Sequence, residues 1–141
     1  MSKTHEGGCL CGAIRFRIDG EPRVVSHCHC SLCRRVSGAP FVTWLTVRKD
    51  KMAITGDLLW YGSSDWGSRG FCPACGTHLV GRSEHYERYW DITAGSLDAP
   101  ERIRPERHVF IGDKVAWLDI SDTLPAHVGD ATTPLVSNEQ P

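Results

Sequence analysis

Short runs in which apolar and polar residues alternate occupy much of the chain, and this period of two is typical of strands with one buried face. In Ala13–Asp19 (AIRFRID), isoleucine and phenylalanine alternate with arginine. Further runs are rich in the β-branched and aromatic residues that strands favour: Phe41–Arg48, Met52–Thr55, Leu58–Tyr61, Trp66–Phe71, Thr77–Val80, Tyr89–Thr93 and Arg107–Ile111. Only Ser31–Ser37 (SLCRRVS) has the composition of a short helical turn. The pattern predicts an all-β fold with one short helical turn.

Length and charge narrow the class of protein. A chain of 141 residues suits one domain; we expect it at residues 1–128, with the polar stretch Gly129–Pro141 as a loosely ordered tail. The formal net charge of -1 argues against nucleic acid as a partner. No apolar run approaches the ~20 residues that span a bilayer, and the polar start of the chain lacks a signal-peptide pattern. We therefore expect a cytoplasmic protein without a membrane partner.

Seven cysteines are the main chemical feature of the sequence. Clustered cysteines in a cytosolic protein more often bind metal than form disulfides, and an odd number also disfavours complete pairing. The most specific motif is Cys72-Pro73-Ala74-Cys75-Gly76, in which proline presets a turn and Gly76 tolerates a positive φ after the second sulfur. A redox CxxC would be followed by a helix that this sequence does not predict. We interpret the motif as a zinc knuckle.

A knuckle supplies two ligands, whereas a closed zinc site needs four. In an extended segment Cys9 and Cys11 point the same way, so they can complete the site while Leu10 faces the core. This assignment leaves a compact trio, Cys28, Cys30 and Cys33, and three protein ligands leave a fourth position open, as in catalytic zinc sites. The spacing also permits a closed site made of the knuckle and the Cys30/Cys33 pair. Both assignments remain open at this point.

Polar residues surround the trio. His27 and His29 are expected to point away from the sulfurs of an extended segment and to pack or form hydrogen bonds behind them. Arg34 and Arg35 follow the trio directly, and their guanidinium groups can hold the carboxylates of a small thiol substrate such as glutathione. Ser37 is placed to line the rim of the same pocket. These three residues are our candidates for substrate binding.

Four stretches of the sequence, GGCLCGAIRF, HCHCSLCRRVSGAPF, FCPACGTHL and HVFIGDKVAWLDISDTLP, together resemble the glutathione-dependent formaldehyde-activating enzyme family, which includes centromere-protein-V-like domains. The resemblance runs from about Gly7 to Pro125. It implies a β-tent fold of small antiparallel sheets with two zinc ions. By position it implies a structural zinc on Cys9, Cys11, Cys72 and Cys75, and a catalytic zinc on Cys28, Cys30 and Cys33.

The resemblance also implies an activity, the joining of glutathione and formaldehyde to S-hydroxymethylglutathione by an enzyme classed as a carbon-sulfur lyase. A zinc held by three thiolates favours a further sulfur ligand over hydrolysis, which agrees with a thiol substrate. The main alternative is a zinc-stapled protein-binding module without catalysis, since a similar β-tent occurs in a small zinc protein that interacts with Rab GTPases. A redox-sensing or zinc-buffering role of the trio is a third reading.

Overall fold

The computed structural model describes residues 3–132. Those residues form ten β-strands, one α-helix and five short 3-10 helices, which confirms the all-β class and the single short helix. The chain divides into two compact units. Of the described residues, unit 1 contains 3–24 and 45–103, and unit 2 contains 25–44 and 104–132. Strands β3 (Val24–Cys28) and β4 (Val42–Arg48) have residues in both units.

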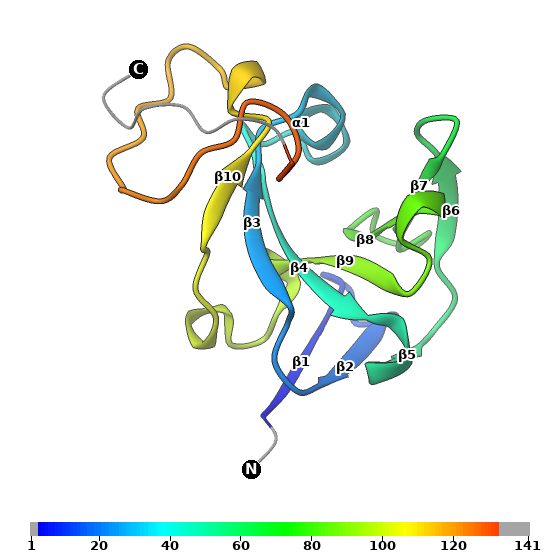
Figure 1. Cartoon of the computed structure of the whole chain (residues 1–141). Coiled ribbons are helices and arrows are strands. Elements are labelled where there is room, and N and C mark those ends of the chain that lie inside the picture. The colour runs from blue at the N-terminus through cyan, green and yellow to red at the C-terminus, as the bar shows by residue number, and fades with distance from the viewer. Residues whose placement is uncertain (1–2, 133–141) are drawn as a thin grey trace. The chain divides into compact units, whose positions relative to one another are not determined.

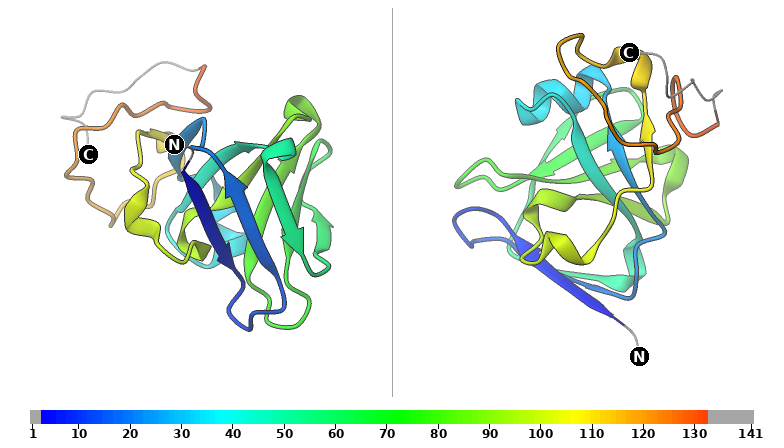
Figure 2. Two further views of the ribbon diagram at one scale, coloured as in Figure 1. Left: turned by 90° about the horizontal axis from the view of Figure 1, so that it is seen from below. Right: turned by 90° about the vertical axis from the view of Figure 1, so that its left-hand side faces the viewer.

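A three-stranded antiparallel sheet in unit 1 has the order β1-β2-β5, and its strands lie side by side in Figures 1 and 2. It consists of β1 (Thr4–Gly8), β2 (Arg15–Asp19) and β5 (Met52–Thr55). In β2 the two apolar side chains are buried and the two arginines exposed, as the alternation predicts. Strand β1 was not predicted, because its sequence THEGG lacks β-branched and aromatic enrichment. Pairing with β2 overrides that weak local preference.

Unit 1 also contains the strand series β4-β9-β8-β7-β6, to which β4 contributes its residues from Leu45 onward. The remaining strands are β6 (Leu59–Gly62), β7 (Gly67–Phe71), β8 (His78–Ser83) and β9 (Tyr89–Thr93). Four 3-10 helices also belong to unit 1: η1 (Lys49–Lys51), η2 (Glu84–Tyr86), η3 (Ala94–Ser96) and η4 (Pro100–Arg102). Apolar side chains from these elements are fully buried, among them Leu45, Leu79, Val80 and Ile92.

Unit 2 is built on the order β10-β3-β4, with β10 (Arg107–Val109) parallel to β3. Helix α1 (Ser31–Ser37) follows β3 after two residues, and η5 (Ile111–Asp113) follows β10 (Figure 1). The core of the unit contains Val42, Trp44 and Val109, together with the buried cysteines of the trio. Two of the seven metal-ligand candidates thus double as core residues of this unit.

The predicted boundaries agree with the structure to within a few residues, and α1, β5 and β9 match their predicted ranges. Of the predicted tail, residues 133–141 lie outside the described part of the chain. Within the described part, Gly129 accepts a hydrogen bond from the amide of Phe110 at 2.7 Å, and Ala131 packs against the core of unit 2. Among residues 3–132 no helix has the length and apolarity needed to cross a bilayer.

Candidate metal centres

Two similar turns in unit 1 carry four of the cysteines. The first contains Cys9 and Cys11 and closes through a hydrogen bond from the amide of Gly12 to the carbonyl of Cys9 at 3.2 Å. The second contains Cys72 and Cys75 and closes through a bond from the amide of Gly76 to the carbonyl of Cys72 at 2.8 Å. Both glycines have positive φ, 84° and 79°. The left-handed conformation expected for the residue after the knuckle is therefore confirmed.

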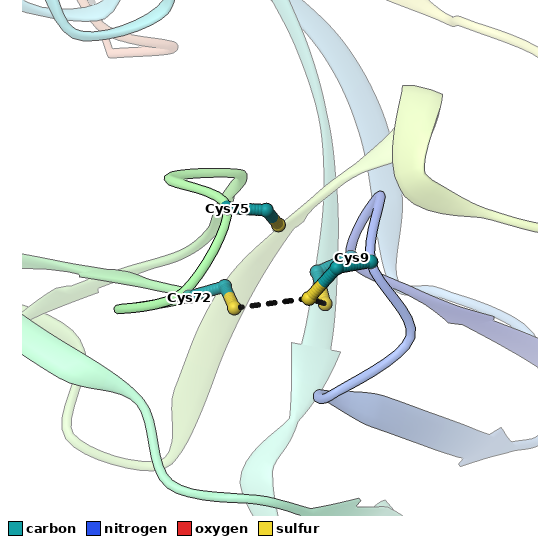
Figure 3. Close-up of side chains that lie close together, drawn as sticks. Cys9, Cys72 and Cys75 are labelled. Carbon is teal, nitrogen blue, oxygen red and sulfur yellow. Dashed lines mark hydrogen bonds between the residues drawn. The ribbon is translucent and has the colours of Figure 1, made fainter.

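The four sulfurs of these turns converge, and Figure 3 shows the side chains of Cys9, Cys72 and Cys75 directed toward one another. The Sγ atom of Cys11 lies 3.6 Å from that of Cys9 and 3.8 Å from that of Cys72. Four ligands at the usual zinc–sulfur distance of about 2.3 Å in a tetrahedron are separated by about 3.8 Å. The donor set and spacing of this group therefore fit a closed zinc site.

The position of Leu10 differs from the prediction. Its side chain is 88% exposed, so it does not face the core. The prediction assumed an extended segment, but Cys9 and Cys11 belong to a tight turn in which the amide of Cys9 bonds to the carbonyl of Ile14 at 3.0 Å. In a turn, unlike a strand, side chains do not alternate between two faces. Both sulfurs therefore lie close to those of the other turn, while the residue between them points to solvent.

Thr77 joins the two turns. Its hydroxyl accepts a hydrogen bond from the amide of Leu10 at 3.0 Å and lies 3.2 Å from the sulfur of Cys75. The hydroxyl and amide of Thr77 lower the pKa of Cys75 to about 5. On the opposite turn, the amide of Ile14 donates to the sulfur of Cys9 at 3.2 Å. Hydrogen bonds of this kind stabilise thiolate ligands, and sequence spacing gave no sign that Thr77 bonds to both turns.

Three cysteines of unit 2 form the second group. Cys28 ends β3, Cys30 is the N-cap of α1 and Cys33 lies in its first turn. The sulfurs of Cys28 and Cys33 are 3.4 Å apart, and the amide of Cys33 donates to the sulfur of Cys30 at 3.3 Å. The neighbouring sulfurs, together with burial, raise the pKa of Cys28. A divalent cation would reverse that effect, because it stabilises the thiolates that otherwise repel one another.

The structure groups Cys9 and Cys11 with the knuckle within unit 1, and Cys28 with Cys30 and Cys33 within unit 2, as in the first of the two assignments considered above. None of the seven cysteines, all of which lie in the described part of the chain, forms a disulfide. Both groups have the donor chemistry of a zinc site, soft sulfur atoms that lie within 4.8 Å of one another. That they bind zinc, and how many ions, stays a prediction.

The three candidates for substrate binding lie on α1. Arg34 is half-buried, and its Nε has no hydrogen-bond partner among residues 3–132, whereas Arg35 is exposed. The Ser37 hydroxyl donates to the carbonyl of Cys33 at 2.8 Å and accepts from the amide of Ala39 at 3.1 Å. Ser37 therefore closes the C-terminal turn of the helix. The arginine side chains retain donors for a ligand, and a substrate contact for any of the three stays a prediction.

Histidines alternate with cysteines at the end of β3 and just after it, in the order His27, Cys28, His29, Cys30. His29 is fully buried, and its Nε2 lies 2.9 Å from Nδ1 of His108. The Nε2 atom of His108 lies 3.0 Å from each carboxylate oxygen of Asp122. His27 bonds through Nδ1 to the Thr43 hydroxyl at 2.8 Å. The expected role of His27 and His29, hydrogen bonding beside the trio, agrees with these contacts. His108 and Asp122 were not predicted, because they come 79 and 93 residues after His29 in sequence.

A small all-β protein with cysteine groups suited to metal binding is the class that the fold and these sites define. The sequence model of the glutathione-dependent formaldehyde-activating enzyme matches residues 4–113, most of the chain. The chain belongs to this family. It is 30% identical to an uncharacterized lyase of Schizosaccharomyces pombe over 84% of its own length and 86% of that protein. It is 28% identical to a Halomonas elongata protein named "Putative glutathione-dependent formaldehyde-activating enzyme", over 82% and 80% of the two chains.

Among solved structures, the crystal structure of a Rhodobacter sphaeroides protein is similar, with a TM-score of 0.54 and 20% sequence identity. The similarity covers 71% of this chain and 91% of the other. At this level of identity it supports the fold alone.

Proposed function

We propose that this protein is a zinc-dependent carbon-sulfur lyase that forms and cleaves a thiol–aldehyde adduct, of the S-(hydroxymethyl)glutathione type. The observation that carries the proposal is the trio Cys28, Cys30 and Cys33, a group of three sulfur ligands with no fourth among the cysteines of unit 2. Three protein ligands leave one coordination position for a substrate. Family membership and the names of the two relatives support the same class of reaction.

The four-cysteine group would hold a structural zinc, because four thiolates complete the coordination shell. The trio would hold the catalytic zinc, which supplies a soft Lewis-acid position where a substrate thiol binds as its thiolate near neutral pH. With seven thiolates and two divalent ions, the net charge of the chain changes from -1 to about -4. With this negative net charge, a cationic side chain near the trio would be needed to attract an anionic substrate such as glutathione.

The chain's own residues prepare the site. The amide of Cys33 bonds to the sulfur of Cys30 and so fixes that sulfur at the start of α1. Arg34 and Arg35 place two positive charges on the same helix, and their forked donors match the carboxylates of a glutathione-like thiol. In the adduct-forming direction the thiolate sulfur forms a bond to the aldehyde carbon, the carbonyl electron pair moves to oxygen, and that oxygen takes up a proton. Cleavage is the reverse.

The test is an NMR measurement of exchange between glutathione, formaldehyde and their adduct, with and without the zinc-loaded protein. We expect faster exchange with the wild type and background exchange with Cys30→Ser, whose four-cysteine group is intact. Arg35→Gln is expected to raise the glutathione concentration needed for half-maximal exchange, whereas Arg88→Gln, an exposed arginine of unit 1, is the matched control. Identical exchange rates with and without wild-type protein would refute the proposed activity and favour the binding module without catalysis.

A further inference from the structure

A cluster of nitrogen and oxygen donors lies in unit 2 apart from the cysteine sulfurs. His27 and His108 are paired residues of the parallel strands β3 and β10, and their ring centroids are 4.9 Å apart. Asp122 reaches this pair from the segment that follows η5. One ligand atom from each of these three residues lies within 4.8 Å of the other two. Because His27 and Cys28 are neighbours in a strand, their side chains point to opposite faces.

The second ring nitrogen of each histidine is already held. Nδ1 of His27 bonds to the Thr43 hydroxyl at 2.8 Å, and Nδ1 of His108 lies 2.9 Å from Nε2 of His29. Histidines that bind metal are usually oriented in this way, because the outer hydrogen bond fixes both the tautomer and the direction of the ring. For both imidazoles, Nε2 is the nitrogen that remains available to a ligand.

The position of Asp122 agrees with a shared ligand. The carboxylate is half-exposed while His108 is buried, with side-chain exposures of 42% and 3%. Nε2 of His108 is equally far, 3.0 Å, from both carboxylate oxygens, so a single N–H proton is not directed at one of them. Ligands about 2.1 Å from a tetrahedral ion are separated by about 3.4 Å, close to this spacing. The exposed side leaves room for water to complete the coordination.

We propose that His27, His108 and Asp122 form a third metal site, for a borderline divalent transition ion such as Zn²⁺, Co²⁺ or Ni²⁺. Two imidazoles and one carboxylate are harder donors than thiolates, so this site and the two cysteine groups should prefer different metal ions. Binding displaces the proton that His108 Nε2 shares with Asp122, and water fills the remaining positions. The ion would fasten the segment around Asp122 to strands β3 and β10, and this proposal does not depend on the proposed enzyme activity.

The test is titration of Co²⁺ into the full-length protein after its cysteine groups have been loaded with zinc. We expect one additional cobalt per chain, with the visible d–d bands of nitrogen and oxygen ligands, no sulfur-to-cobalt charge-transfer band and no release of zinc. His27→Gln and Asp122→Asn are expected to lose this ion, whereas Asp119→Asn, an exposed aspartate nearby, retains it. Thr43→Val is expected to weaken cobalt binding by about 10- to 100-fold, because the hydrogen bond that orients His27 is lost.

A second measurement uses the wild type alone and therefore does not depend on the folding of any variant. In ¹⁵N spectra of the histidine rings, added Zn²⁺ should shift Nε2 of His27 and His108 and leave the exposed His85 unchanged. The proposal is overturned if the zinc-loaded wild type takes up no further ion, or if both His27→Gln and Asp122→Asn still bind that ion. Cobalt uptake matched by zinc release, with a charge-transfer band, would also overturn it, because the ion would then occupy the cysteine groups.

Discussion

Replacing Thr77 with valine removes a hydroxyl that contacts both turns of the four-cysteine group while leaving the volume of the side chain nearly unchanged. Two contacts are lost, one with the sulfur of Cys75 at 3.2 Å and one from the amide of Leu10 at 3.0 Å. The Leu10 side chain is 88% exposed, so solvent has access to this turn and its amide can bond to water instead. The uncompensated loss is therefore the hydrogen bond to the ligand sulfur.

The expected loss of zinc affinity follows from the number of hydrogen bonds that are lost and not replaced. Losing a hydrogen-bond partner of a metal ligand lowers metal affinity by about 10- to 100-fold. Because only one of the two lost contacts stays unreplaced, we expect the lower part of this range, a zinc affinity about 10- to 30-fold weaker for Thr77→Val. Thr77→Ser keeps the hydroxyl and should stay within a few-fold of the wild type.

The assay is competition for zinc with a chromophoric chelator, which resolves the four-cysteine group from the trio when Cys30→Ser is the common background. The melting temperature of each variant checks that the fold is retained. An affinity for Thr77→Val equal to that of the wild type would refute the reasoning. So would equal weakening by Thr77→Val and Thr77→Ser, because the effect would then not come from the hydroxyl.

The other predictions concern the division of labour between the two cysteine groups and the response to acid. Cys72→Ser should release the structural ion and destabilise the fold by several kcal/mol, because metal binding and folding are coupled, whereas Cys30→Ser should lose about one zinc and keep most of the fold. Zinc content and thermal unfolding of the two variants test these outcomes. Equal unfolding by the two variants would contradict the assignment of a structural and a catalytic cysteine group. Burial, with a smaller effect of the Arg69 charge, lowers the pKa of His78 to about 4. The unfolded chain takes up this proton near pH 6.5, so stability should fall as the pH drops from about 6.5 to about 4. Urea midpoints at pH 7 and 5 should differ less in His78→Gln than in the wild type, while His85→Gln, at an exposed position, should keep the wild-type difference; equal differences in all three would contradict the prediction.

Local features of the fold could be predicted from the sequence because their causes lie within a few residues. The alternation in Ala13–Asp19 predicted a half-buried strand, and its apolar residues Ile14, Phe16 and Ile18 are all buried. The glycine after the knuckle indicated a left-handed turn, which Gly76 adopts. Strand β1 was not found, because pairing partners rather than its own residues make it a strand. Gly7 illustrates this, since a Cβ atom there would lie 2.3 Å from the carbonyl oxygen of Ser96, distant in sequence.

The spacing of the cysteines by itself indicated metal binding. It left two groupings of the cysteines open, because any two pairs of sulfurs can share an ion if the fold brings them together. Only the tertiary structure placed the turn of Cys9 against the turn of Cys72, 63 residues later in the chain, so that their four sulfurs form one group. The same holds for His108 and Asp122, which reach β3 through strand pairing and a following loop. Neighbouring residues determine the geometry of short-range hydrogen bonds. Long-range contacts depend instead on how strands pair, and no local sequence pattern encodes that pairing.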